Sequence, residues 1–90
     1  MITFLDCVAL CGLNEEEVFA IAEHENIPPM AAAALAQHLL RKANGCNAIC
    51  QMIVDDIDRA SKRGHLRHRD ELRVTLSRFV DRYPELAHAH

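Results

Sequence analysis

Apolar residues recur along the chain at helical spacing, and glycine, proline and asparagine interrupt the recurrence between segments. The first segment predicts a helix over residues 3–11, because four apolar side chains share one helical face and Gly12 follows them. These side chains are Phe4, Cys7, Val8 and Cys11. Asn14 is expected to cap a second helix that reaches about residue 26, with Glu17 placed as in a capping box. Its buried face is expected to comprise Val18, Ile21 and Ala22, extended by Phe19.

Two prolines separate the second helix from a third, Ala-rich one. A residue that precedes proline avoids the helical region, so Ile27-Pro28-Pro29 predicts a boundary. Pro29 itself suits the first position of the next helix, which is expected over residues 29–42. This helix is apolar nearly all round, a pattern typical of a helix in the middle of a domain. Asn44-Gly45 is expected to end it.

The last two helices are predicted over residues 47–63 and 66–83, with Gly64 between them and Pro84 after them. Their inward-facing residues are expected to be Cys46, Ile49, Cys50, Ile53, Ile57 and Ala60, and then Leu72, Leu76, Phe79, Val80 and Tyr83. The sequence therefore predicts a single all-α domain over residues 1–90. About five helices are expected to pack around the buried third helix.

Charge divides the chain into an acidic part and a basic part. Residues 1–40 carry six acidic residues and no Lys or Arg, whereas residues 41–90 carry ten basic and seven acidic residues. One interpretation is that the acidic second helix lies against the basic helical hairpin, so that the charges offset each other. The other is that opposite faces of two copies attract each other.

Four cysteines form two C-x3-C pairs, Cys7 with Cys11 and Cys46 with Cys50. Residues four apart on a helix are neighbours, so two such helices side by side would present four thiolates, a set that zinc accepts. Structural zinc sites favour C-x2-C on turns, however, and these cysteines all lie on apolar stripes, where Cys packs as a small hydrophobe. We expect core packing without a cofactor, with a zinc or redox site as the alternative.

Other polar residues suggest weaker hypotheses. His24 lies between Glu23 and Glu25, and nearby negative charge favours the imidazolium and so a raised pKa. The favoured interpretation is nevertheless an ordinary helix-end histidine near the last carbonyls. His38, on the apolar third helix, is expected to be a hydrogen-bonded core or interface residue. The acidic run is expected to form a solvated face, since no EF-hand spacing surrounds it. It comprises Asp55, Asp56 and Asp58.

The basic segment from Arg59 to Arg73 raises the question of nucleic acid. The second and third helices resemble a helix-turn-helix only superficially, because the third would present methyl groups to the bases. Acidic residues also dilute the basic segment, so nucleic-acid binding is not expected. Catalysis is not expected either, because the chain has no Gly-rich phosphate loop, no nucleophile elbow and no serine with an assignable base.

The start of the chain lacks a positive region and reaches Asp6 early, which is unlike a signal peptide. The longest apolar run covers residues 27–36, about half of the ~20 residues that a membrane span needs. We therefore expect a cytoplasmic protein with reduced thiols and no membrane contact.

Several short motifs together resemble those of a group of small, uncharacterised bacterial all-helical proteins, and the similarity covers most of the chain. The motifs are Cys11-Gly12-Leu13, the stretch 20–25 followed by Ile27-Pro28, Asp55-Asp56-Ile57, and Phe79 with Tyr83-Pro84. The resemblance implies a bacterial cytosolic origin. It implies no activity, cofactor or functional residue.

The leading hypothesis is a non-catalytic protein-interaction module or accessory subunit, with homodimerisation as one form. It expects the acidic second helix or the basic hairpin to lie in the contact, so that charge reversal at Arg67 and Arg69 weakens association. The competing hypothesis is a thiol-dependent metal-binding or redox protein that uses Cys7, Cys11, Cys46 and Cys50.

Overall fold

The computed structural model describes residues 13–83, which form four helices and no strand. The helices are α2 (Glu15–Glu25), α3 (Pro29–Leu40), α4 (Gly45–Lys62) and α5 (Leu66–Arg82). The prediction of an all-α fold is confirmed for this part of the chain, with four helices rather than about five. The helix predicted over residues 3–11 lies outside the described residues.

The predicted capping box starts α2. The Asn14 side chain accepts a hydrogen bond from the Glu17 backbone N–H at 2.9 Å, and the Glu17 side chain accepts one from the Asn14 N–H at 3.2 Å. The helix ends at Asn26, which adopts the left-handed conformation (φ 56°, ψ 50°). The Ile27 N–H then donates to the Ala22 carbonyl, which satisfies an end carbonyl that the helix leaves free.

Pro29 occupies the start of α3 as predicted, but the role expected of Asn44-Gly45 was wrong. Gly45 does not end α3; it is the first residue of α4 and is buried. A Cβ atom on Gly45 would lie 1.5 Å from the Leu39 carbonyl oxygen. The glycine is therefore required by the close approach of two backbones at the corner between α3 and α4.

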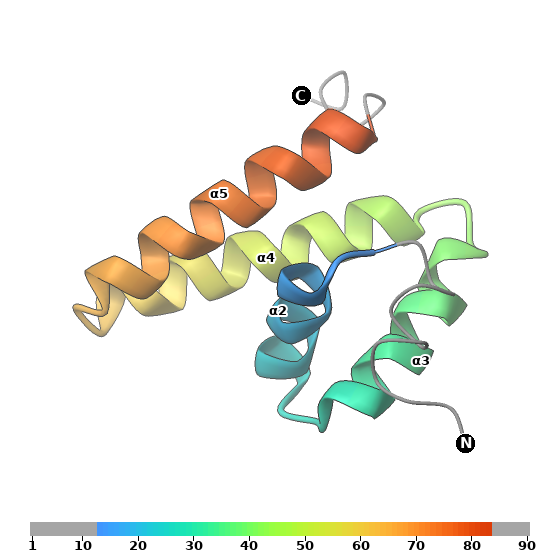
Figure 1. The fold of residues 1–90 in the computed structure, drawn as a ribbon, viewed down its shortest axis with the longest axis horizontal. Helices are drawn as coiled ribbons and strands as arrows, with labels where there is room; N and C mark the ends of the chain where they lie inside the picture. Colours follow the sequence, from blue (N-terminus) through green and yellow to red (C-terminus); the bar gives the residue numbers. More distant parts are fainter. Residues whose placement is uncertain (1–12, 84–90) are drawn as a thin grey trace.

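Gly64 joins α4 and α5 in a tight hairpin (Figure 1). Its φ of 76° is left-handed, the Gly64 N–H donates to the Ser61 carbonyl, and the His65 N–H donates to the Ala60 carbonyl. These two bonds make a Schellman motif, which fixes the direction in which the chain leaves α4. The predicted break at Gly64 is confirmed.

The Ala-rich α3 is not the central helix. Helices α2 and α4 each contact all three other helices, and α2 crosses the α4–α5 hairpin, whereas α3 lies beside α2 and α4 (Figure 1). Only Ala32, Ala33 and Ala36 of α3 are buried, and Met30 is 45% exposed. The expectation of a buried third helix was wrong. Alanine side chains are small, so a narrow stripe of three alanines is enough to pack α3 against its neighbours.

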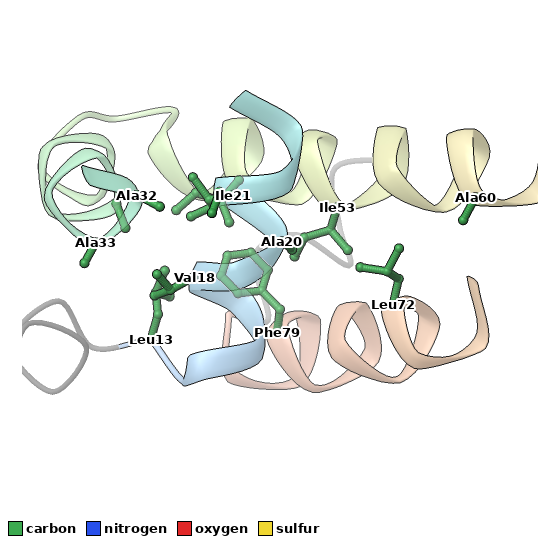
Figure 2. Packing of buried hydrophobic residues seen from close by; sticks show 13 residues of the cluster. Leu13, Val18, Ala20, Ile21, Ala32, Ala33, Ile53, Ala60, Leu72 and Phe79 are labelled. Carbon is green, nitrogen blue, oxygen red and sulfur yellow. The ribbon is translucent and has the colours of Figure 1, made fainter. Parts of the chain in front are cut away.

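The apolar core lies where α2 meets the other helices (Figure 2). The stripes predicted for the last two helices are confirmed, since their members are buried or half-buried. The fully buried members include Ile49 and Ile53 on α4 and Phe79 on α5. Phe19 was expected to extend the buried face of α2, but it is 46% exposed, and Ala20 is buried instead. None of the described helices is long and apolar enough to cross a membrane.

Candidate functional site

A hydrogen-bonded pair between α2 and α5 is shared by two neighbouring hollows. His68 Nε2 lies 2.6 Å from Glu23 Oε1, and both residues line both hollows. We call the hollow toward the α4–α5 turn the polar hollow and the one along α2 and α5 the acidic groove. Because they share this pair, we treat the two as one candidate site.

The polar hollow has a volume of about 430 Å³ and is lined mainly by charged and imidazole side chains. Its lining residues are Glu23, His24, Asn26, Arg59, Ala60, Arg63, His65 and His68. The ends of α2 and α4 meet here, and their last carbonyls favour positive side chains. His24, Arg59 and Arg63 therefore have a structural explanation before any ligand is invoked.

A buried carboxylate lies close to these lining residues. Asp56 is fully buried, and neither of its carboxylate oxygens has a hydrogen-bond partner among residues 13–83. Burial raises the pKa of Asp56 to about 7, and the negative charge of Glu23 acts in the same direction. The positive charges of His24, Arg59 and His68 oppose this rise without cancelling it. Asp56 therefore exchanges its proton near neutral pH, an unusual property that marks functional or strained sites.

His24 ties α2 to α4. Its Nδ1 lies 2.7 Å from Glu25 Oε2 and its Nε2 lies 2.9 Å from Asp55 Oδ2. Partial burial acts to lower the pKa of His24, but the hydrogen bonds to Asp55 and Glu25 outweigh it and raise the pKa. The raised pKa suggested by the sequence is confirmed, although the strongest partner, Asp55, comes from another helix. Hydrogen bonds to Gln51 and His24 lower the pKa of Asp55 in turn.

The acidic groove runs between α2 and α5 and has a volume of about 190 Å³. Its floor is formed by the buried residues Ala20, Leu72 and Thr75, and the Thr75 hydroxyl is satisfied by the Glu71 carbonyl within α5. Half-exposed Phe19 forms one wall. Three exposed carboxylates and one histidine also line it: Glu16, Glu23, Glu71 and His68. The groove therefore combines an apolar floor with an acidic rim.

The turn between α4 and α5 projects a basic segment that we call the hairpin tip, residues 61–67, all of which are exposed. Within it, Leu66 is 52% exposed and lies between Arg63 and Arg67. The predicted solvated hairpin is confirmed by exposed pairs at helical spacing, such as Lys62 with Asp58 at 2.9 Å.

The acidic α2 does pack against the basic hairpin, as one interpretation of the charge pattern expected. Glu23 pairs with His68, and Glu17 pairs with Arg82 near the end of α5. Glu17 is fully buried, and its second carboxylate oxygen finds no hydrogen-bond partner in the described part of the chain. Glu17 and Glu23 belong to the acidic helix that was expected to contact a partner, but both pair with residues of the same chain instead.

Cys46 and Cys50 are half-buried and pack against the core, in agreement with the expected packing role. Burial raises the pKa of the Cys50 thiol, which disfavours the thiolate form that metals and redox chemistry need. Cys7 and Cys11 lie outside the described residues, so the four-cysteine zinc site stays a prediction. Residues 13–83 hold no group of three His, Cys, Asp or Glu side chains placed to bind a metal ion.

Two expectations about polar residues were wrong in part. His38 is exposed, so it is not a core histidine, because α3 turns this side away from its neighbours, and the interface role stays a prediction. Asp56 is not part of a solvated face, although Asp58 is exposed as expected. A sequence signal for Asp56 did exist, since it continues the helical spacing of Ile49 and Ile53 and so falls on the buried stripe. The acidic groove had no such signal, because it depends on how α2 crosses α5.

The chain matches no protein-family model, no curated protein and no solved structure. The resemblance to small bacterial helical proteins gains no support from these comparisons. The residues of the candidate site are therefore the basis for the function proposed below.

Proposed function

We propose that the protein is a non-catalytic interaction module whose acidic groove binds a protein segment with an apolar side chain flanked by Lys or Arg. The observation that carries the proposal is the juxtaposition of half-exposed Phe19, a buried apolar floor and three rim carboxylates. Exposed aromatic side chains beside apolar pockets are typical anchors of protein interfaces. The cytoplasmic setting expected from the sequence belongs to this proposal.

The acidic rim selects the charge of the partner. Glu16 and Glu71 are exposed, and the pairs that Glu71 makes with Arg67 and His68 are long, at 3.7 Å each. Exposed pairs of this kind contribute at most about 1 kcal/mol, so an incoming basic residue can replace them. An acidic partner would instead face like charges, which lowers both its affinity and its rate of association.

The histidines of the site support a binding role over a catalytic one. The hydrogen bonds of His24 and His68 run to carboxylates on other helices or in the same turn, and these bonds hold α2 to the hairpin. Asp56 has a suitable pKa for proton transfer near neutrality but is fully buried. The hydrogen bonds of His24 and His68 thus stabilise the packing of α2 against α4 and α5, and this packing shapes the acidic groove.

A synthetic peptide with leucines flanked by arginines tests the proposal, and its matched control has glutamate in place of every arginine. In NMR titrations of the full chain, only the arginine peptide should shift the amide signals of Phe19, Ala20, Leu72 and Thr75. Phe19→Ser should weaken binding about tenfold, since it removes about 1.5 kcal/mol of apolar contact. Met30→Ser, at a similarly exposed apolar position on α3, should leave binding unchanged. Equal binding of both peptides, or shifts confined to α3, would overturn the proposal.

A further inference from the structure

We propose that the segment occupying the acidic groove is the hairpin tip of a second copy of this chain, with Leu66 on the apolar floor. This inference rests on the proposed function and names its partner. The hairpin tip has the required chemistry, because an apolar side chain that is 52% exposed lies between two exposed arginines, Arg63 and Arg67. The tip and the groove are therefore complementary in both charge and polarity.

The charges of the two surfaces favour contact between copies. The tip presents Lys62, Arg63 and Arg67, and all three are exposed. The groove presents Glu16, Glu23 and Glu71, of which Glu23 is already paired with His68. In the isolated chain Arg67 reaches Glu71 only at 3.7 Å, and both side chains are largely exposed, so this pair can be exchanged for one between copies.

The order of the two surfaces along α5 allows a closed assembly. The tip ends at Arg67, and the part of the groove contributed by α5 begins at His68 and continues to Thr75. Two copies related by a two-fold axis can therefore each lay a tip across the groove of the other. Such a contact is reciprocal and leaves neither groove empty, which favours a dimer over an open chain of copies.

The tip is also preorganised for this contact. The left-handed Gly64 and the hydrogen bond from the His65 N–H to the Ala60 carbonyl hold it in one conformation. Leu66 and Arg67 already belong to the first turn of α5. A segment that is ordered before binding loses less conformational entropy when it docks.

Sedimentation equilibrium of the full chain is the first test, and we expect a dimer that weakens as salt is raised, because salt screens exposed charges. Leu66→Asp should weaken the dimer by at least about tenfold, the cost of removing one buried leucine side chain from the contact. Val74→Asp is the matched control, since Val74 lies on the same helix and is 51% exposed. It should leave the dimer intact.

A charge exchange makes the test specific to the two surfaces. Arg63→Glu/Arg67→Glu gives an acidic tip with an acidic groove, and Glu16→Arg/Glu71→Arg gives a basic tip with a basic groove. Each double variant alone should be monomeric, whereas their equimolar mixture should form a mixed dimer in which both contacts are restored. All substituted positions are exposed, so circular dichroism should report unchanged helicity.

The outcomes separate the inference from the proposed function. Specific dimers have dissociation constants well below about 200 μM. A wild-type chain that stays monomeric at this concentration would therefore overturn the inference. If the arginine peptide still binds the groove of that monomer, the groove serves another protein and the proposed function stands. A dimer that survives Leu66→Asp but is lost in Met30→Glu would place the contact on α3 and overturn the inference as well.

Discussion

Replacing Asp56 by asparagine tests whether a buried, unpaired carboxyl controls the pH dependence of stability. The pKa of Asp56 is about 7 in the folded chain, against 3.8 for an ordinary aspartate. The folded state thus binds the proton more tightly than the unfolded state does. Stability linked to Asp56 is fully present below about pH 3.8 and is lost as the pH rises through about 7.

The magnitude follows from the size of the shift. A difference of about three pKa units corresponds to a loss of up to about 4 kcal/mol when the carboxyl ionises. Asparagine has nearly the same shape and no charge, but its amide stays buried without partners, which costs about 1–3 kcal/mol. We therefore expect Asp56→Asn to stabilise the fold by about 2 kcal/mol at about pH 8, and to be neutral or slightly destabilising at about pH 4.5.

Urea denaturation followed by circular dichroism at both pH values measures this difference. Asp58→Asn is the matched control, because Asp58 is exposed on the same helix and belongs to the surface pair with Lys62 described above. It should change stability by less than about 0.5 kcal/mol at either pH. If Asp56→Asn destabilises the fold at the higher pH, or has the same effect at both, Asp56 is not an uncompensated buried charge and the reasoning fails.

The histidine at the same site should reinforce the trend in the wild-type chain. Because the pKa of His24 is raised in the folded state, its contribution is present below about pH 6.5 and is lost as the pH rises through the folded value. The lowered pKa of Asp55 acts in the opposite sense, with its contribution lost as the pH falls below about 3.8. The stability linked to these three groups is therefore expected to be greatest near about pH 4 and to fall as the pH rises toward about 7.

Three further substitutions or reactions test other features of the fold. Gly45→Ala should cost about 2–3 kcal/mol in urea denaturation, because its Cβ has no room at the α3–α4 corner, and a cost below about 0.5 kcal/mol would contradict the observed approach. Arg82→Ala should cost about 2–3 kcal/mol by leaving the buried Glu17 unpaired, whereas Arg78→Ala, exposed on the same helix, should cost less than about 0.5 kcal/mol. Cys50 should be alkylated by iodoacetamide about tenfold more slowly in the folded chain than in urea, as measured by peptide mass spectrometry, and equal rates would revive the thiol hypothesis.

The local structure followed from sequence because its causes lie within a few residues. The capping box of Asn14 with Glu17, the start of α3 at Pro29 and the break at Gly64 each depend on one or two side chains or a single backbone conformation. The helical spacing of apolar residues also identified the buried faces of α4 and α5. These features needed no knowledge of how the helices are arranged in space.

The arrangement itself depended on contacts that spacing does not encode. The apolar character of α3 suggested a central position, yet α2 and α4 are the helices that contact all three others. The packing of α2 also buries Glu17, which pairs with Arg82 from the far end of the described chain. Phe19 was predicted to extend the buried face of α2, next to Val18. Its exposure makes sense only once α5 is seen to place Leu72 beside it and leave a groove.

The pairing of Glu17 with Arg82 has a consequence for how the protein is made. The carboxylate belongs to the first turn of α2, and the guanidinium that offsets its burial is encoded 65 positions later. A ribosome delivers the chain from its N-terminus, so α2 emerges long before Arg82 is available to it. We expect the nascent chain to hold only loosely packed helices until the end of α5 has emerged, after which the domain closes around α2 in a single late step.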